Sequence, residues 1–140
     1  MRQTPEHGIQ VAYFDYVRLK RNVDFDWRLV FAIPNGAKLP YAKKLDRKTG
    51  KMTRYSREAQ WLIAEGLTPG VADVMIAIPN WKAMIPYACI EFKAGSNKQT
   101  EEQLGFETDV SAVGAVYWVC RSPEDAIEKT ERYIKEARGD

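Results

Sequence analysis

The chain has 140 residues, of which 45% are hydrophobic and 29% are charged. This length and balance predict one globular domain, residues 1–140, with a single hydrophobic core. No apolar run approaches the ~20 residues of a membrane span, and the start of the chain lacks the apolar stretch of a secretory signal. We therefore expect a cytoplasmic protein that has no membrane partner.

The formal net charge is only +2, but it is distributed unevenly. Residues 38–57 carry eight basic side chains against Asp46 alone, so this segment is +7 and the remainder of the chain is −5. Such a segment is either a solvated loop or a strip that binds anions. The candidate nucleic-acid-binding residues within it are Lys43, Lys44, Arg47, Lys48, Lys51 and Arg54.

The two cysteines, Cys89 and Cys120, lie in apolar runs typical of strands and are expected to be buried free thiols. With a single histidine, His7, the chain offers no spacing typical of a zinc site.

The first half of the chain begins with a predicted helix over residues 5–20, with Thr4 as its N-cap. The run WRLVFAIPNG predicts a strand that ends at Pro34. Residues 37–55 show little periodicity and are expected to form a mobile loop. A short helix capped by Ser56 follows, through residue 65, and Gly66 ends it.

The second half predicts two strands, ADVMIAIP and IPYACIEFKA, joined through NWKAM. A helix follows over SNKQTEEQLGFETDVSAVG, with a capping box from Thr100 to Gln103 and Gly114 at its end. The run AVYWVC predicts a strand buried on both faces, and Ser122 caps a final amphipathic helix. The fold class is therefore α/β: a mixed β-sheet flanked by helices.

Acidic residues interrupt both central strands. Alternation places Glu91 and Lys93 on one strand face, opposite to Ile90 and Phe92. If the two strands form a hairpin symmetric about Lys82, Asp73 lies opposite Glu91, with Cβ atoms ~5 Å apart, where like charges destabilise the pair. The arrangement therefore requires a cation.

Two interpretations of this cation remain open. Glu91 and Lys93 can form a surface ion pair on a half-exposed strand, because so short a motif has many chance matches. Alternatively, clustered oxygen ligands with Asp73 suit Mg²⁺, which keeps several waters and prefers phosphate-bearing substrates. A nearby lysine can then hold the attacking water and neutralise charge that develops on a phosphate.

These residues resemble the motif of the PD-(D/E)XK nucleases: Asp73, then Glu91-Phe92-Lys93 on the next strand. Within that superfamily the chain resembles the VRR-NUC branch, in its phage-type stand-alone form, from Glu6 to about Ala126. The runs that carry the resemblance are PEHGIQ, IPNG, EGLTPGVADVMI, IEFKAGSNKQTEEQ and GAVYWVCRSPEDA. The resemblance implies a restriction-endonuclease-like fold.

The resemblance also implies roles for individual residues. Asp73, Glu91 and the main-chain carbonyl of Phe92 would bind Mg²⁺ or Mn²⁺, and Lys93 would be the catalytic lysine. Glu6 matches an acid of the first helix close to the metal, although an acid in the first turn also stabilises a helix by itself. Gln103 matches a glutamine that positions water or Lys93, and the capping box is its alternative role. Gln10 lies one turn after Glu6 and can reach the same site.

The function implied is a metal-dependent, structure-selective DNA endonuclease that acts on branched DNA such as Holliday junctions, in a bacterial or phage-infected cell. A homodimer would reach the paired scissile phosphates of such a substrate together. The alternatives are a non-catalytic nucleic-acid-binding or assembly module on the same fold, and a nuclease that acts on other DNA or on RNA.

Overall fold

The computed structural model of the chain describes residues 4–34, 42–45, 52–55 and 57–139, with the main chain alone at residues 42–45, 52–55 and 59. The elements in chain order are α1 (Pro5–Arg21), a 3-10 helix η1 (Phe25–Leu29), β1 (Val30–Ala32), β2 (Ala42–Leu45), β3 (Met52–Tyr55), α2 (Arg57–Ala64), β4 (Val74–Ile76), β5 (Ala88–Phe92), α3 (Glu101–Ala112), β6 (Val116–Cys120) and α4 (Pro123–Ala137).

The main sheet has four strands in the order β1-β4-β5-β6. The pairs β1–β4 and β4–β5 are antiparallel, and β5–β6 is parallel, so the sheet is mixed as predicted. In the β4–β5 hairpin, Val74 pairs with Ile90 and Ile76 with Ala88. The predicted register, symmetric about Lys82, is therefore confirmed.

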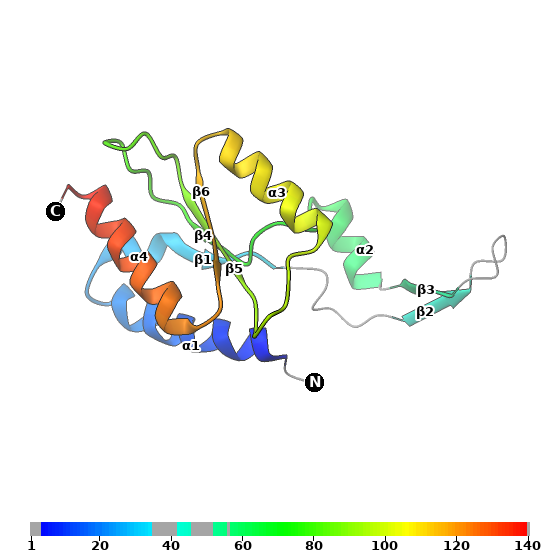
Figure 1. The fold of residues 1–140 in the computed structure, drawn as a ribbon. Helices are drawn as coiled ribbons and strands as arrows, with labels where there is room; N and C mark the ends of the chain where they lie inside the picture. Colours follow the sequence, from blue (N-terminus) through cyan, green and yellow to red (C-terminus); the bar gives the residue numbers. More distant parts are fainter. Residues whose placement is uncertain (1–3, 35–41, 46–51, 56, 140) are drawn as a thin grey trace.

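Helices cover both faces of this sheet (Figure 1): α1 and α4 lie on one face, and α3 lies on the other. The larger core forms under α1 and α4 around Tyr13, Ile90 and Phe92. The smaller one forms under α3 around Cys89 and Val110. Alternate residues of β5 thus enter opposite cores, as strand geometry requires. No helix of the described residues is long and apolar enough to cross a membrane.

Three helix starts follow the predicted chemistry. The side chain of Thr4 accepts a hydrogen bond from His7 N, and that of Ser122 accepts one from Asp125 N. At α3, Thr100 and Gln103 form the complete capping box. That helix begins only at Glu101, so the prediction of helix from Ser96 onward was wrong: residues 94–100 form a loop, and the cap fixes the start of the helix.

The strand predicted over WRLVFAIPNG is shorter than expected. Residues 25–29 form η1, and only Val30–Ala32 are extended. The side chain of Asp24 caps η1 by accepting a hydrogen bond from Asp26 N at 3.1 Å. The indole of Trp27 is thereby turned into the core, where the residue is 2% exposed. Local capping thus overrides the β propensity of this run.

Two further predictions need correction. Instead of a loop throughout residues 37–55, β2 and β3 pair with each other as a separate antiparallel two-stranded sheet. The strand β6 is not buried on both faces: residues 116–119 are only half-buried, and Cys120 alone is buried. The position of β6 at the edge of the sheet explains this partial exposure. Both cysteines are buried and free, as expected.

Candidate active site

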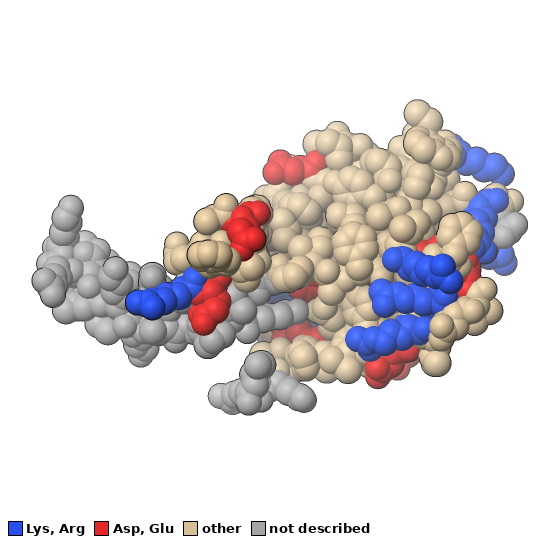
Figure 2. Space-filling model, turned by 180° about the vertical axis from the view of Figure 1, so that it is seen from behind, with Lys and Arg blue, Asp and Glu red and all other residues tan. Residues whose placement is uncertain are grey.

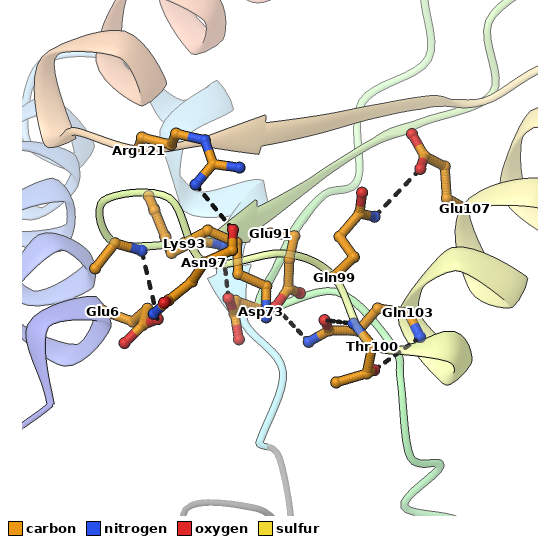
Figure 3. Close-up of polar contacts among 12 residues, drawn as sticks. Glu6, Asp73, Glu91, Lys93, Asn97, Gln99, Thr100, Gln103, Glu107 and Arg121 are labelled. Carbon is orange, nitrogen blue, oxygen red and sulfur yellow. Dashed lines mark hydrogen bonds and ion pairs between the residues drawn. The ribbon is translucent and has the colours of Figure 1, made fainter.

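The start of β4 and the end of β5 bring two carboxylates together. Asp73 directly precedes β4, and one further step of the β4–β5 register places it opposite Glu91. Both residues are buried, with 4% of Asp73 and 2% of Glu91 exposed. Figure 3 shows their side chains next to each other in front of the sheet. The predicted juxtaposition of the two acids is therefore present in the fold.

The turn before Asp73 is fixed by close packing. Gly70 has a φ of +88°, and a Cβ atom there would lie 2.6 Å from main-chain atoms of Glu102 at the start of α3. Only glycine accommodates both the conformation and the contact. At the end of the turn, Ile33 N donates a hydrogen bond to Asp73 O at 2.8 Å. The backbone of Asp73 is thus held between β1 and α3.

One oxygen of each carboxylate accepts a hydrogen bond from a fixed donor. Phe92 N donates to Asp73 Oδ2 at 2.8 Å, and Gln103 Nε2 donates to Glu91 Oε1 at 2.7 Å. Hydrogen bonds to ionised acceptors are stronger than those to neutral ones. These donors orient the two acids with respect to each other.

Lys93 supplies positive charge to the pair. Its Nζ lies 3.9 Å from Glu91 Oε1, and its side chain is only 12% exposed. Its main-chain N donates to Cys120 O at 3.1 Å, which extends the β5–β6 pairing by one residue. The ion pair between Glu91 and Lys93 is therefore a buried feature of the site and not the surface pair that was the alternative interpretation. In formal charge, two carboxylates beside one ammonium sum to −1.

Gln103 has the capping role that its sequence position allowed, and in addition a contact with Glu91 that the sequence did not predict. Its Oε1 accepts from Thr100 N at 2.8 Å, which completes the capping box. Its Nε2 donates to Glu91, as described above. The two ends of one amide thus connect the start of α3 to the acid of β5.

Glu6 lies at the edge of this group, where it contacts the loop after Lys93. Its Oε1 accepts from Asn97 Nδ2 at 2.9 Å and from Ala94 N at 3.4 Å. The Asn97 hydrogen bond is the largest influence that holds the pKa of Glu6 below its ordinary value, and the charge of Lys93 acts in the same direction. In this conformation the hydrogen bonds of Glu6 connect α1 to the loop of residues 94–100.

Sequence reasoning did not identify the residues that hold this loop. Arg121 Nη1 donates to Gly95 O at 2.7 Å and to Asn97 O at 2.9 Å. Gln99 Nε2 contacts Glu107 Oε1 at 3.2 Å and the hydroxyl of Tyr117 at 3.3 Å. Burial and the negative charge of Glu91 raise the pKa of Tyr117. Contacts to residues so far apart in the chain leave no periodic signal in the sequence.

Gln10 lies on α1, where it lines a neighbouring cavity. Of the basic residues, Lys43 and Lys44 are on β2 and Arg54 is on β3, with their side chains outside the description. Arg47, Lys48 and Lys51 lie outside the described residues altogether.

The donor set fits a hard divalent cation with few protein ligands. Asp73, Glu91 and the carbonyl of Phe92 offer oxygen atoms only, and the buried carboxylates leave a negative charge. Among the described residues no group of three or more His, Cys, Asp or Glu side chains is placed to hold a metal, so Glu6 is not part of such a set in this conformation. Mg²⁺ fits two carboxylates because it keeps several waters as its other ligands.

Comparison with known proteins supports the fold. A solved structure described as a "VRR_NUC domain protein" superposes with a TM-score of 0.67, at 16% sequence identity, over 96% of this chain and 92% of that one. The chain therefore has the fold of that protein along nearly its whole length. No protein-family model matches the sequence, and no curated protein matches it.

Proposed function

We propose that the chain is a metal-dependent endonuclease that hydrolyses phosphodiester bonds in DNA, with selectivity for branched structures such as Holliday junctions. The observation that carries the proposal is the buried group of Asp73, Glu91 and Lys93, with Lys93 Nζ 3.9 Å from Glu91 Oε1. Burying two opposed acids is costly, and a binding module gains nothing from acids that would repel phosphate.

The group has the parts that phosphodiester hydrolysis requires. Asp73, Glu91 and the carbonyl of Phe92 would hold Mg²⁺ or Mn²⁺. When bound, such an ion supplies Lewis-acid polarisation of the phosphate and lowers the pKa of a bound water. The ammonium of Lys93 can orient the attacking water and stabilise the negative charge that builds on the phosphoryl oxygens. The hydrogen bond from Gln103 holds the carboxylate of Glu91 in its orientation.

The proposed partner is DNA, and we propose that a homodimer presents two such sites to one substrate. The +7 segment at residues 38–57 would bind backbone phosphates and so select shape rather than sequence. Neutralising Lys43, Lys44, Arg47 and Lys48 together should lower the slope of log affinity against log salt by about 0.9 for each duplex phosphate that the variant no longer neutralises. An unchanged slope would remove this segment from the interface.

The test is a cleavage assay on end-labelled four-way junction, flap and linear duplex of matched sequence. Reactions contain Mg²⁺, Mn²⁺ or a chelator. We expect cleavage that requires metal and is fastest on the branched DNA. Equal rates on all three substrates would contradict structure selectivity, and binding without cleavage under every metal would favour the non-catalytic alternative.

A further inference from the structure

A cavity of about 450 Å³ lies between α1 and the end of β1. Its helix side is formed by His7, Gln10, Arg18 and Arg21, which follow one stripe of α1. Its other side is formed by residues 32–34, which lie at the edge of the main sheet. In Figure 2, Lys and Arg side chains gather at one end of the face seen from behind.

The charge of this cavity is opposite to that of the candidate active site. None of the described residues that line it is acidic, and two are arginines. Arg21 donates to the main-chain carbonyls of Trp27 and Val30 at 3.2 and 2.6 Å, and these neutral groups leave its charge intact. Arg18 pairs with Asp15 at 3.3 Å, but both side chains are more than 60% exposed, and such pairs contribute little. Arg18 can therefore exchange this partner for a stronger anion.

One end of the cavity borders the acids. Ile33 in its wall donates its N–H to the carbonyl oxygen of Asp73 at 2.8 Å. On the helix side, His7 follows Glu6, whose carboxylate accepts from Ala94 N, next to Lys93. From His7 to Arg21 the helix rises about 21 Å, which equals the rise along the duplex axis of about six phosphates of one strand.

The helix α1, which forms one side of the cavity, is fixed by contacts to the rest of the fold. In the middle of α1, the hydroxyl of Tyr13 lies 2.7 Å from Thr130 Oγ1 of α4, in the core. At the C-terminal end of α1, Arg21 donates hydrogen bonds to main-chain carbonyls of η1 and β1. The cavity is therefore formed before any ligand arrives, which lowers the ordering cost of binding.

We propose that this cavity holds the sugar–phosphate backbone of the DNA strand next to the scissile phosphate. His7 lies nearest the cut, and Arg18 and Arg21 contact phosphates further along the strand. The apolar floor, which includes Val11 and Pro34, packs against sugars. This inference rests on the proposed nuclease function, because it takes the acids at the cavity's end as the place of cleavage.

The test measures binding without cleavage. In a Lys93→Ala background, the anisotropy of a fluorescein-labelled 12-nucleotide oligothymidine and of a hairpin duplex is followed across a salt series. The variant carries His7→Gln and Arg18→Gln, both at exposed positions. The matched control is Arg132→Gln, since Arg132 pairs with Glu128 on the exposed face of α4 at 3.0 Å, much as Arg18 pairs with Asp15 on α1.

We expect weaker binding of the double variant, with the control unchanged. Its salt slope on the single strand should be smaller by about 0.7 for each phosphate that it no longer neutralises. A double variant that binds like the control would overturn the proposal. Thymidine monophosphate that competes as well as the oligonucleotide would also overturn it, in favour of a mononucleotide site. Metal-dependent cleavage by the unaltered protein is measured separately: its absence would overturn the nuclease function, whereas a failure in anisotropy alone overturns only the strand site.

Discussion

Gln103 Nε2 donates a hydrogen bond to Glu91 Oε1 at 2.7 Å, while the same amide's Oε1 accepts from Thr100 N. One side chain therefore fixes both the start of α3 and the orientation of a buried acid. Its effect on stability and its effect on the site can be separated, because each depends on a different end of the amide.

Thr100→Ala and Gln103→Glu distinguish these effects. Thr100→Ala removes the cap and should cost about 1 kcal/mol of stability with little change in cleavage. Gln103→Glu keeps an acceptor for Thr100 N but replaces the donor to Glu91 with a negative charge. We expect cleavage to fall about 10–100-fold, the usual loss when a partner of a metal ligand is removed. Urea unfolding and single-turnover cleavage measure the two quantities. Equal cleavage by the two variants would show that Gln103 acts only as a cap.

Asp73 can be tested through stability without substrate. Asp73→Asn removes one of two opposed charges and keeps an acceptor for Phe92 N, so in chelator the protein should gain on the order of 1 kcal/mol. Asp73→Ala leaves Phe92 N without its acceptor and should cost about 1–3 kcal/mol. Mg²⁺ or Mn²⁺ should raise the melting temperature of the unaltered protein but not of Asp73→Asn, because only the former binds it tightly in the native state. A clear loss of stability for Asp73→Asn in chelator would make Asp73 a structural residue.

Glu6 gives the fold a pH dependence of known sign. Its pKa is lowered in the folded state, chiefly by the hydrogen bond from Asn97. The stability that this contact contributes is present above the ordinary value of 4.5 and is lost as the pH falls through the lowered pKa. Glu6→Gln should therefore change the urea midpoint more at about pH 7 than at about pH 3. Glu128→Gln, in an exposed pair on α4, is the control, and a pH profile of Glu6→Gln identical to that of the unaltered protein would contradict the assignment.

The thiols should be unreactive in the native protein. Burial raises the pKa of Cys89 to about 11 and that of Cys120 to about 12. Because the thiolate is the reactive form, iodoacetamide at about pH 8 should label neither thiol until the protein unfolds, after which both react. The raised pKa values also make the stability of the fold depend on pH, because the folded state favours the neutral thiols. This stabilisation is present below the ordinary value near 9 and is lost as the pH rises through the folded pKa values. Rapid labelling of native protein would show that the strands open locally.

The parts of the fold that local chemistry determines were predictable. The register that places Asp73 opposite Glu91 follows from alternation and a symmetric turn. The capping box can be recognised from the four residues between Thr100 and Gln103. The 3-10 helix η1 was not predicted, because a single capping side chain, that of Asp24, outweighed the strand propensity of these residues. The pairing of β2 with β3 left no clear alternation in the sequence.

The candidate site was predictable only in its centre. Glu91 lies on β5, and Asp73 and Lys93 lie one residue beyond the ends of β4 and β5, so the pairing of these two strands places them together. The contact of Glu6 with Asn97 joins residues 91 positions apart and depends on where α1 packs. That of Arg121 with Gly95 joins the end of β6 to the loop after β5. Such contacts follow from tertiary structure, and no spacing in the sequence indicates them.

The most direct test of the account is the single-turnover cleavage rate of a labelled four-way junction in Mg²⁺, compared between the unaltered protein and Lys93→Ala. Lys135→Ala, at an exposed lysine of α4, is the matched control. We predict that Lys93→Ala binds the junction with similar affinity but does not cleave it, and that Lys135→Ala cleaves at the normal rate. Cleavage by Lys93→Ala at the rate of the control would contradict the claim that this lysine and its two acids form the active site.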